Sequence, residues 1–190
     1  MKNIKTEFKV WSTYFITLLL ANFFHELGHC IPAWTHGYSA IPTPAKMYTL
    51  ASIPPNLVKY VSLGGIINSV IFTGLVIVYF AKSSFKYNSA VLAGGIAMPS
   101  VYTLRFILSG RGHDQTEFQE AQSALGLSYT GHFIDWLLLF LLILGVAAWI
   151  IKSKPSIKIF GRLLIGAVLS LAFIVLLQKI NNSIFDPIFS

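Results

Sequence analysis

Charged side chains are scarce in this chain. They make up 11% of its 190 residues, whereas they account for roughly 25% of a typical soluble domain. The apolar runs leave none of the polar outer faces that a soluble helical bundle needs. Cysteine is rarer still, and the single residue Cys30 excludes an internal disulfide. Composition therefore predicts an integral membrane protein without a disulfide framework.

Acidic residues are also few. Seven Asp and Glu stand against fourteen Lys and Arg, which gives a net charge of +7. The basic residues are scattered between apolar runs and do not form the patch or stripe of a nucleic-acid-binding protein. We therefore expect no nucleic-acid partner, and we expect the basic side chains to face the anionic surface of a lipid bilayer.

Five apolar segments predict an all-α membrane protein with about five transmembrane helices, in which residues 1–190 form one domain. The second segment is uncharged for 21 residues, which at about 1.5 Å per residue spans a hydrocarbon core of about 30 Å. Pro99 predicts a kink in the third segment. We expect a core within residues 10–120 and two additional helices within 132–180. The segments are Trp11–Phe24, Val61–Ala81, Ala90–Leu108, Phe133–Ile151 and Phe160–Leu177.

The linker between the first two segments, Ile31–Tyr60, contains five prolines, which exclude a regular spanning helix. Within it, Lys46–Ser52 has the composition of a strand. The sequence predicts a proline-rich linker at the membrane edge. It leaves open whether this linker contains a small β-sheet or is a plain interfacial loop.

A zinc-binding signature, His-Glu-Leu-Gly-His, follows the first apolar segment directly. Residues four apart share a helix face, so His25 and His29 can bind one metal ion, while Glu26 can act as general base toward a metal-bound water. With five His and four Glu in the chain, roughly 0.003 matches to this motif are expected by chance. The alternative to a working site is a degenerate site that no longer binds metal.

A third metal ligand is expected on the membrane face that holds His29. Two helices separate His29 from the polar cluster Gly110–Glu120, so both lie on the same face. A catalytic zinc takes three protein ligands and leaves the fourth position for water. Asp114 is our candidate for the third ligand, and Glu117 and His113 are held in reserve.

Asp114 also has a structural interpretation. Followed by Glu117, it is typical of a helix N-cap with a capping box, at the start of a short helix that runs through Ala124. The remaining histidines, His36 and His132, are expected to be ordinary interfacial residues, with His132 marking the start of the fourth apolar helix.

Two of these motifs resemble a known family. The run His25–His29, followed by Ala33 and Gly37, resembles the first motif of the site-2 protease family of intramembrane zinc metalloproteases. Gly64–Asn68, ahead of a long apolar run, is similar to that family's Gly-x-x-x-Asn element. The family's third motif places its metal-binding Asp in Asn-Pro-x-Pro-x-x-Leu-Asp-Gly, whereas Asp114 here lies in Gly-His-Asp-Gln-Thr-Glu-Phe.

The resemblance implies an activity and a substrate. It implies a zinc-dependent intramembrane endopeptidase, with one zinc per chain, that cuts the transmembrane segments of membrane-protein substrates after these segments unwind. The chain resembles a near-minimal membrane core of the family with two extra helices. In the family, the linker after the first motif forms a small sheet whose edge can pair with an extended substrate.

Two asparagines are candidates for supporting roles. By the resemblance, Asn68 lies beside the site and donates a hydrogen bond to the substrate backbone or to the developing oxyanion. Its alternative is a helix-packing amide next to Gly64 and Gly65. Asn22, one helical turn before His25, either orients that histidine or bonds a neighbouring helix.

Charge asymmetry predicts the orientation in the membrane. The face opposite the predicted site carries nine basic residues and the face of the site carries five, so the positive-inside rule places the N-terminus in the cytoplasm and the site on the other side. The resemblance predicts the reverse, because site-2 proteases commonly open to the cytosol. The nine are Lys2, Lys5, Lys9, Lys82, Lys86, Lys152, Lys154, Lys158 and Arg162. The five are Lys46, Lys59, Arg105, Arg111 and Lys179.

Two other functions stay open. A membrane zinc hydrolase can act on a lipid or a lipid-linked group, because the same activated water attacks esters and amides alike. A non-enzymatic metal-binding or metal-carrying membrane protein is the other alternative. Transport favours polar or charged ligands repeated through several helices, and the predicted spans are nearly free of them.

Overall fold

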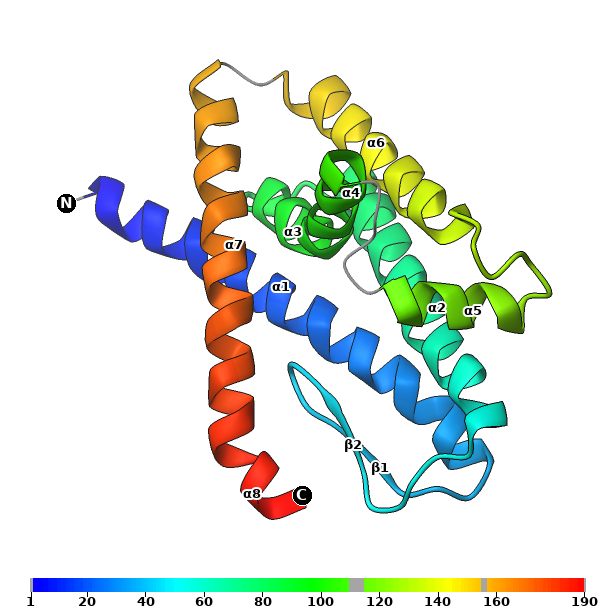
Figure 1. The fold of residues 1–190 in the computed structure, drawn as a ribbon. Helices are drawn as coiled ribbons and strands as arrows, with labels where there is room; N and C mark the ends of the chain where they lie inside the picture. Colours follow the sequence, from blue (N-terminus) through cyan, green and yellow to red (C-terminus); the bar gives the residue numbers. More distant parts are fainter. Residues whose placement is uncertain (1, 110–114, 155–156, 190) are drawn as a thin grey trace.

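The computed structural model describes residues 2–109, 115–154 and 157–189, and these form an all-α fold with one small antiparallel hairpin (Figure 1). The predicted all-α class is confirmed. The elements are α1 (Lys2–Thr35), β1 (Ala40–Pro42), β2 (Met47–Thr49), α2 (Pro55–Lys82), α3 (Asn88–Gly95), α4 (Ala97–Ser109), α5 (Gln115–Ala124), α6 (Phe133–Ser153), α7 (Ile157–Ile184) and α8 (Asp186–Phe189).

Helices α1 and α2 cross with their backbones in direct contact. A Cβ atom on Gly28 would lie 2.3 Å from the Gly64 carbonyl oxygen, and a Cβ on Gly64 would lie 2.3 Å from the Gly28 carbonyl oxygen. The next residue, Gly65, leaves space for the imidazole of His29, whose Cε1 would lie 2.3 Å from an added Cβ. Small residues that permit such close approach are typical of packed membrane helices. The glycines therefore fix the C-terminal part of α1 against the N-terminal half of α2.

The third apolar segment is a bent pair, α3 and α4, which turns by 45° at Ile96. Pro99 lies in the first turn of α4 and has no N–H with which to bond the carbonyl of Gly95, four residues earlier. That carbonyl instead accepts a hydrogen bond from Thr73 Oγ1 of α2, at 3.4 Å. The predicted kink is confirmed, and it lies three residues before the proline.

Helix α5 is a short helix that packs on α2. Phe118 and Ala121 are buried in a cluster with residues of α2, α4 and α6, and the Phe118 ring meets the ring of Tyr102 edge-on at 5.6 Å between centroids. On the α2 side, Ser62 Oγ donates a hydrogen bond to Glu120 Oε2 at 2.7 Å. An apolar and a polar contact therefore fix the rotation of α5 about its own axis.

The loop from α5 to α6 is closed by one buried side chain. Gln122 Nε2 donates to the Gly131 carbonyl at 2.9 Å, and its Oε1 accepts from the Ile134 backbone N–H at 3.3 Å. The helix ends at Ala124, as the sequence predicts. This bracing holds α5 near the start of α6.

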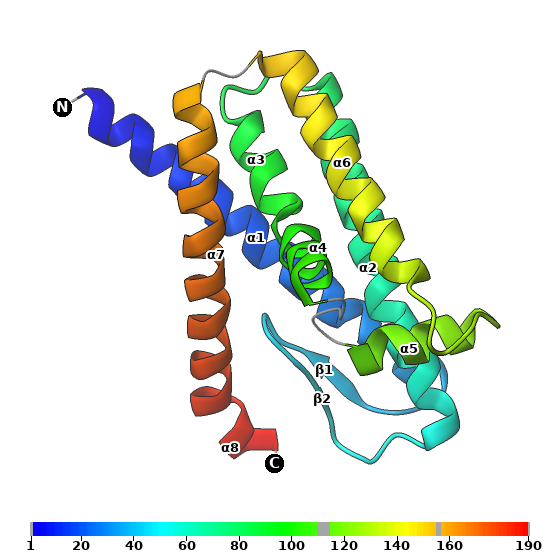
Figure 2. The same ribbon diagram turned by 45° about the horizontal axis from the view of Figure 1, so that its top comes forward.

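The linker between α1 and α2 contains the hairpin β1–β2, in which Ile41 lies opposite Tyr48. The hairpin lies between the C-terminal end of α1 and the C-terminal half of α7 (Figure 2). Asn181 of α7 joins the two, because its Nδ2 donates to the Tyr48 hydroxyl at 2.6 Å and its Oδ1 accepts from Thr43 Oγ1 at 2.5 Å. The position of this linker at a membrane edge stays a prediction.

Helix α7 lies across α1, apart from the α2–α6 pair (Figure 1). Besides Asn181, it is fixed at Ser170, whose Oγ bonds the Tyr14 hydroxyl, and at the Gly166 carbonyl, which accepts from that hydroxyl at 3.1 Å. Between these points the ring of Phe173 packs on that of Phe15. Most other described side chains of α7 are exposed.

Two helices are long and apolar enough to cross a membrane, α2 and α6, and the bent pair α3–α4 makes a third if it counts as one span. Within α7, Val168–Ile184 is apolar but shorter than a span. Helix α1 is longer than any of these, but its apolar sequence is interrupted by Asn22, His25, Glu26 and His29. Two or three spans are therefore supported among the described residues, and five stays a prediction.

Candidate metal centre

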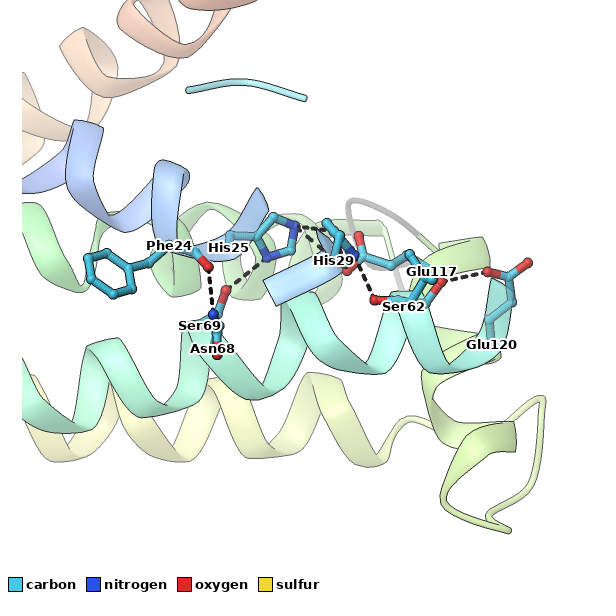
Figure 3. Close-up of polar contacts among 9 residues, drawn as sticks. Phe24, His25, His29, Ser62, Asn68, Ser69, Glu117 and Glu120 are labelled. Carbon is cyan, nitrogen blue, oxygen red and sulfur yellow. Dashed lines mark hydrogen bonds and ion pairs between the residues drawn. The ribbon is translucent and has the colours of Figure 1, made fainter. Parts of the chain in front are cut away.

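The two histidines of the motif face each other on α1. His25 Nε2 and His29 Nε2 lie 3.1 Å apart, and the planes of the two rings are at 84° (Figure 3). His25 is 5% exposed. Their spacing of four residues on an α-helix puts both rings on one side, as predicted.

Contacts from α2 hold the other nitrogen of each ring. His29 Nδ1 donates to the Val61 carbonyl at 2.8 Å, so Nε2 is the ring nitrogen that carries the lone pair with which a histidine binds a metal. His25 Nδ1 lies 2.9 Å from Ser69 Oγ. Both Nε2 atoms therefore point at one place, and α2 fixes them there.

Glu117 of α5 supplies a third donor at the same place. Its Oε1 lies 3.7 Å from His25 Nε2 and 3.7 Å from His29 Nε2. Together, the three donor atoms lie within 4.8 Å of one another. Glu117 is in the first turn of α5, and the contact of Glu120 with Ser62 described above sets the direction in which it points (Figure 3).

The spacing of these donors fits one zinc ion. Two atoms bound to a tetrahedral zinc at about 2.0–2.1 Å lie about 3.3–3.4 Å from each other. The observed separations are 3.1 Å between the imidazoles and 3.7 Å from Glu117 to each. Imidazole nitrogen and carboxylate oxygen are both zinc ligands, and two His with one Glu is a donor set of catalytic zinc enzymes. Small shifts of the side chains would therefore complete the coordination.

A cavity of about 450 Å³ opens on this centre. Glu26 lines it beside His25, His29 and Glu117, which places a carboxylate that is not among the three ligands next to them. The opposite wall comes from the hairpin tip, Pro44–Met47, and from the α7 residues around Ile174. The arrangement combines three candidate metal ligands, a further carboxylate and a partly apolar chamber.

Asn68 lies elsewhere. Its Nδ2 donates to the Phe24 carbonyl at 3.0 Å (Figure 3). The side chain lines a second, apolar cleft together with Ile71 and Leu75 of α2. This contact is of the helix-packing kind that the sequence left as the alternative. The structure does not bring Asn68 into the cavity with Glu26, and its catalytic role stays a prediction.

Asn22 does not orient His25. The side chain that contacts the ring's Nδ1 is Ser69, a residue of α2. A serine 44 positions away in a helix of apolar residues gave no signal in the sequence, because only the crossing angle of α1 and α2 brings it to the ring. Asn22 instead lines the cavity.

Asp114 and His113, the candidate and reserve ligands of the polar cluster, lie outside the described residues. The other reserve, Glu117, is the residue that the structure brings to the histidines. The remaining histidines are not part of this group. His36 Nδ1 bonds the Pro32 carbonyl at 2.8 Å, and His132 pairs with Asp135 at 3.2 Å where α6 begins.

Comparison with known proteins identified no related protein. No protein-family model matches the chain, and no curated protein or solved structure matches it either. The resemblance to site-2 proteases therefore rests on the motifs around His25, Glu26 and His29 and on the Gly64–Asn68 run alone.

Proposed function

We propose that this protein is a zinc-dependent intramembrane endopeptidase. The observation that carries the proposal is the convergence of donor atoms from His25, His29 and Glu117 within 4.8 Å, in a cavity that Glu26 also lines. Two imidazoles and one carboxylate are the protein ligands of several zinc peptidases. Helices α1 and α5, which carry these residues, both pack on α2, and this long apolar helix supports a substrate that is itself in the membrane.

Glu26 is the general base of the proposed reaction. When bound, zinc supplies a Lewis acid and lowers the pKa of a water molecule to about 7. Glu26 takes a proton from the attacking water as the water oxygen bonds to the peptide carbonyl carbon and the π electron pair moves onto the carbonyl oxygen. It then gives this proton to the amide nitrogen, the C–N bond breaks, and an acid and an amine leave.

The proposed substrate is a transmembrane segment that is extended around the bond to be cut. A helix keeps its carbonyl groups in internal hydrogen bonds, so attack requires local unwinding. The hairpin tip, Pro44–Met47, lines the cavity, and each strand of a two-stranded sheet has an outer edge that can pair with an extended chain.

For the topology, we propose that α1 and α7 also enter the bilayer and that the N-terminus is cytoplasmic. Lys152 of α6 donates to the carbonyls of Ala81 and Ser83, at 3.1 and 2.7 Å, which joins the ends of α2 and α6 into one basic end of the molecule. The metal centre lies toward the other end of α2. A reporter fused at Ser190 is expected outside the cytoplasm, and a cytoplasmic reporter would contradict this topology.

The test of the activity is Glu26→Gln in purified protein reconstituted into vesicles. We expect about one zinc per chain in both wild type and variant, cleavage of single-span peptides by the wild type, and no detectable cleavage by Glu26→Gln, because the base is lost while the three ligands remain. Glu7→Gln is the matched control, since it removes a carboxylate from the same helix far from the cavity, and its cleavage rate should equal that of the wild type.

The other outcomes are equally informative. Cleavage that persists in Glu26→Gln would contradict the mechanism. Hydrolysis of phospholipid esters without peptide cleavage, lost in Glu26→Gln, would replace the peptidase by a lipid hydrolase with the same centre. Zinc binding with neither activity would favour the non-enzymatic alternative.

A further inference from the structure

Asn22 is a buried polar residue whose side-chain oxygen is not hydrogen-bonded to any described residue. It lies on α1 one turn before His25 and is 5% exposed. Its Oδ1 is buried and has no hydrogen-bond partner among the described residues. An unsatisfied buried amide oxygen destabilises the folded state, so a residue that only packed there would be better replaced by an apolar one.

Other polar residues of the same helix are satisfied locally. The hydroxyls of Thr13 and Thr17 donate hydrogen bonds to the backbone carbonyls four residues earlier, at 2.8 and 2.9 Å. This is the common solution for a hydroxyl in an apolar helix. An asparagine amide offers both a donor and an acceptor, and Asn22 is therefore suited to a partner that comes from outside the helix.

The cavity is where such a partner would lie. Asn22, Glu26 and His29 recur at intervals of four and three residues, so they share one side of α1. Asn22 lines the cavity together with them. An amide group rotates between two orientations at little cost, so its N–H can turn toward the cavity when a partner is present.

We propose that Asn22 binds the substrate carbonyl that is attacked, with its Nδ2 donating a hydrogen bond to that oxygen as negative charge develops on it. This rests on the proposed hydrolytic function of the site. The amide of asparagine does not titrate, so its ability to donate a hydrogen bond does not change with pH. It also takes no proton from the reaction that Glu26 catalyses as base. Asn22 thus takes the role that the sequence suggests for Asn68, whose amide is bound to the Phe24 carbonyl.

The test uses a probe that does not depend on cleavage. Full-length protein is loaded with Co²⁺ in place of zinc, and acetohydroxamic acid, which binds such metals through its two oxygens, is titrated while the visible spectrum is recorded. Asn22→Leu keeps a similar volume without polar atoms, and Asn22→Asp keeps the shape without an N–H. Thr17→Val is the matched control, since it removes a buried polar group from the same helix.

We expect all three variants to bind cobalt with wild-type stoichiometry. The Kd of acetohydroxamic acid should rise about 10-fold or more in both Asn22 variants, because a hydrogen bond to a charged oxygen is lost, and should stay unchanged in Thr17→Val. With a cleavable peptide, kcat should fall about 10²- to 10³-fold in the Asn22 variants with little change in KM.

The failures are distinguishable. An unchanged Kd in Asn22→Leu with normal cobalt content would overturn the role of Asn22 and leave the hydrolase proposal standing. Loss of cobalt in Asn22→Leu would also overturn it, because Asn22 would then support the metal and not the substrate. A wild type that binds neither zinc nor cobalt would overturn the metal centre itself and this inference with it.

Discussion

The two walls of the cavity differ in how tightly they are packed. On one side, the α1–α2 crossing carries His25 and His29 and holds them with backbone contacts so close that glycine is required at Gly28 and Gly64. On the other side, α7 reaches the cavity with apolar side chains that are largely exposed, such as Leu171 at 46% and Val175 at 51%.

The two sides also differ in what holds them in place. Buried residues follow one another along α2 from Leu57 to Phe80. In α7, by contrast, the described side chains that hydrogen-bond to other elements are Ser170 and Asn181. We infer that the α1–α2 crossing is a fixed scaffold for the metal ligands. Helix α7 is a cover that can separate from the cavity at a smaller free-energy cost.

The largest effect is expected from breaking the scaffold. Gly64→Ala would place a Cβ 2.3 Å from the Gly28 carbonyl oxygen, a backbone atom that can move only with the whole helix. We expect a loss of about 1–3 kcal/mol or more in stability together with weaker zinc binding, because α2 also positions both imidazoles. Thermal unfolding in detergent and metal analysis measure the two effects.

Gly74→Ala is the matched control on the same helix. A Cβ at Gly74 meets nothing within 4 Å, and Ala favours a helix over Gly by about 0.5–1 kcal/mol. The melting temperature should therefore stay the same or rise. Equal losses at Gly64 and Gly74 would contradict the close crossing.

A smaller effect is expected from loosening the cover. Tyr48→Phe removes the hydroxyl that accepts from Asn181 and donates to Asp186 at 2.6 Å. Two hydrogen bonds at about 1 kcal/mol each predict hydrogen exchange about 5- to 30-fold faster at the end of α7 and in α8, with zinc content unchanged. Tyr129→Phe, in the exposed loop after α5, is the control and should change neither.

The smallest effect concerns pH. Burial, and the hydrogen bond to the Asp186 carboxylate, raise the pKa of Tyr48 from 10.0 to about 12. Because the folded pKa exceeds the unfolded one, the contribution of this anchor is complete below about pH 10 and is lost as pH rises through about 12. The difference in tyrosinate absorbance between wild type and Tyr48→Phe should have its midpoint near 12; a midpoint near 10 would show that the contact is not formed.

The same anchor should weaken in acid. The hydrogen bond from Tyr48 and the nearby Lys46 lower the pKa of Asp186 below its ordinary 3.8. Its contribution is therefore present above pH 3.8 and is lost as pH falls through the lowered folded value. Between these limits, the contribution of this pair to the protection of α8 should not change with pH.

Local features of the fold were predictable from the sequence. The end of α5 at Ala124 and the kink ahead of Pro99 follow from rules that act within one turn of a helix. The facing of His25 and His29 follows from helix geometry alone. Each depends on neighbours in the chain.

The features that the sequence did not decide depend on packing between distant segments. Asp114 and Glu117 lie three residues apart in one polar cluster, and the choice between them depends on how Phe118 and Glu120 dock α5 on its neighbours. The contact of Tyr48 with α7 joins residues 133 positions apart. No periodicity or spacing encodes such a contact.

The most direct test of the central claim is the zinc content of two variants, Glu117→Ala and Asp114→Ala, measured beside the wild type in purified protein. A centre built from His25, His29 and Glu117 predicts about one zinc per chain in the wild type and in Asp114→Ala, and a loss of zinc in Glu117→Ala. Zinc retained in Glu117→Ala and lost in Asp114→Ala would contradict it.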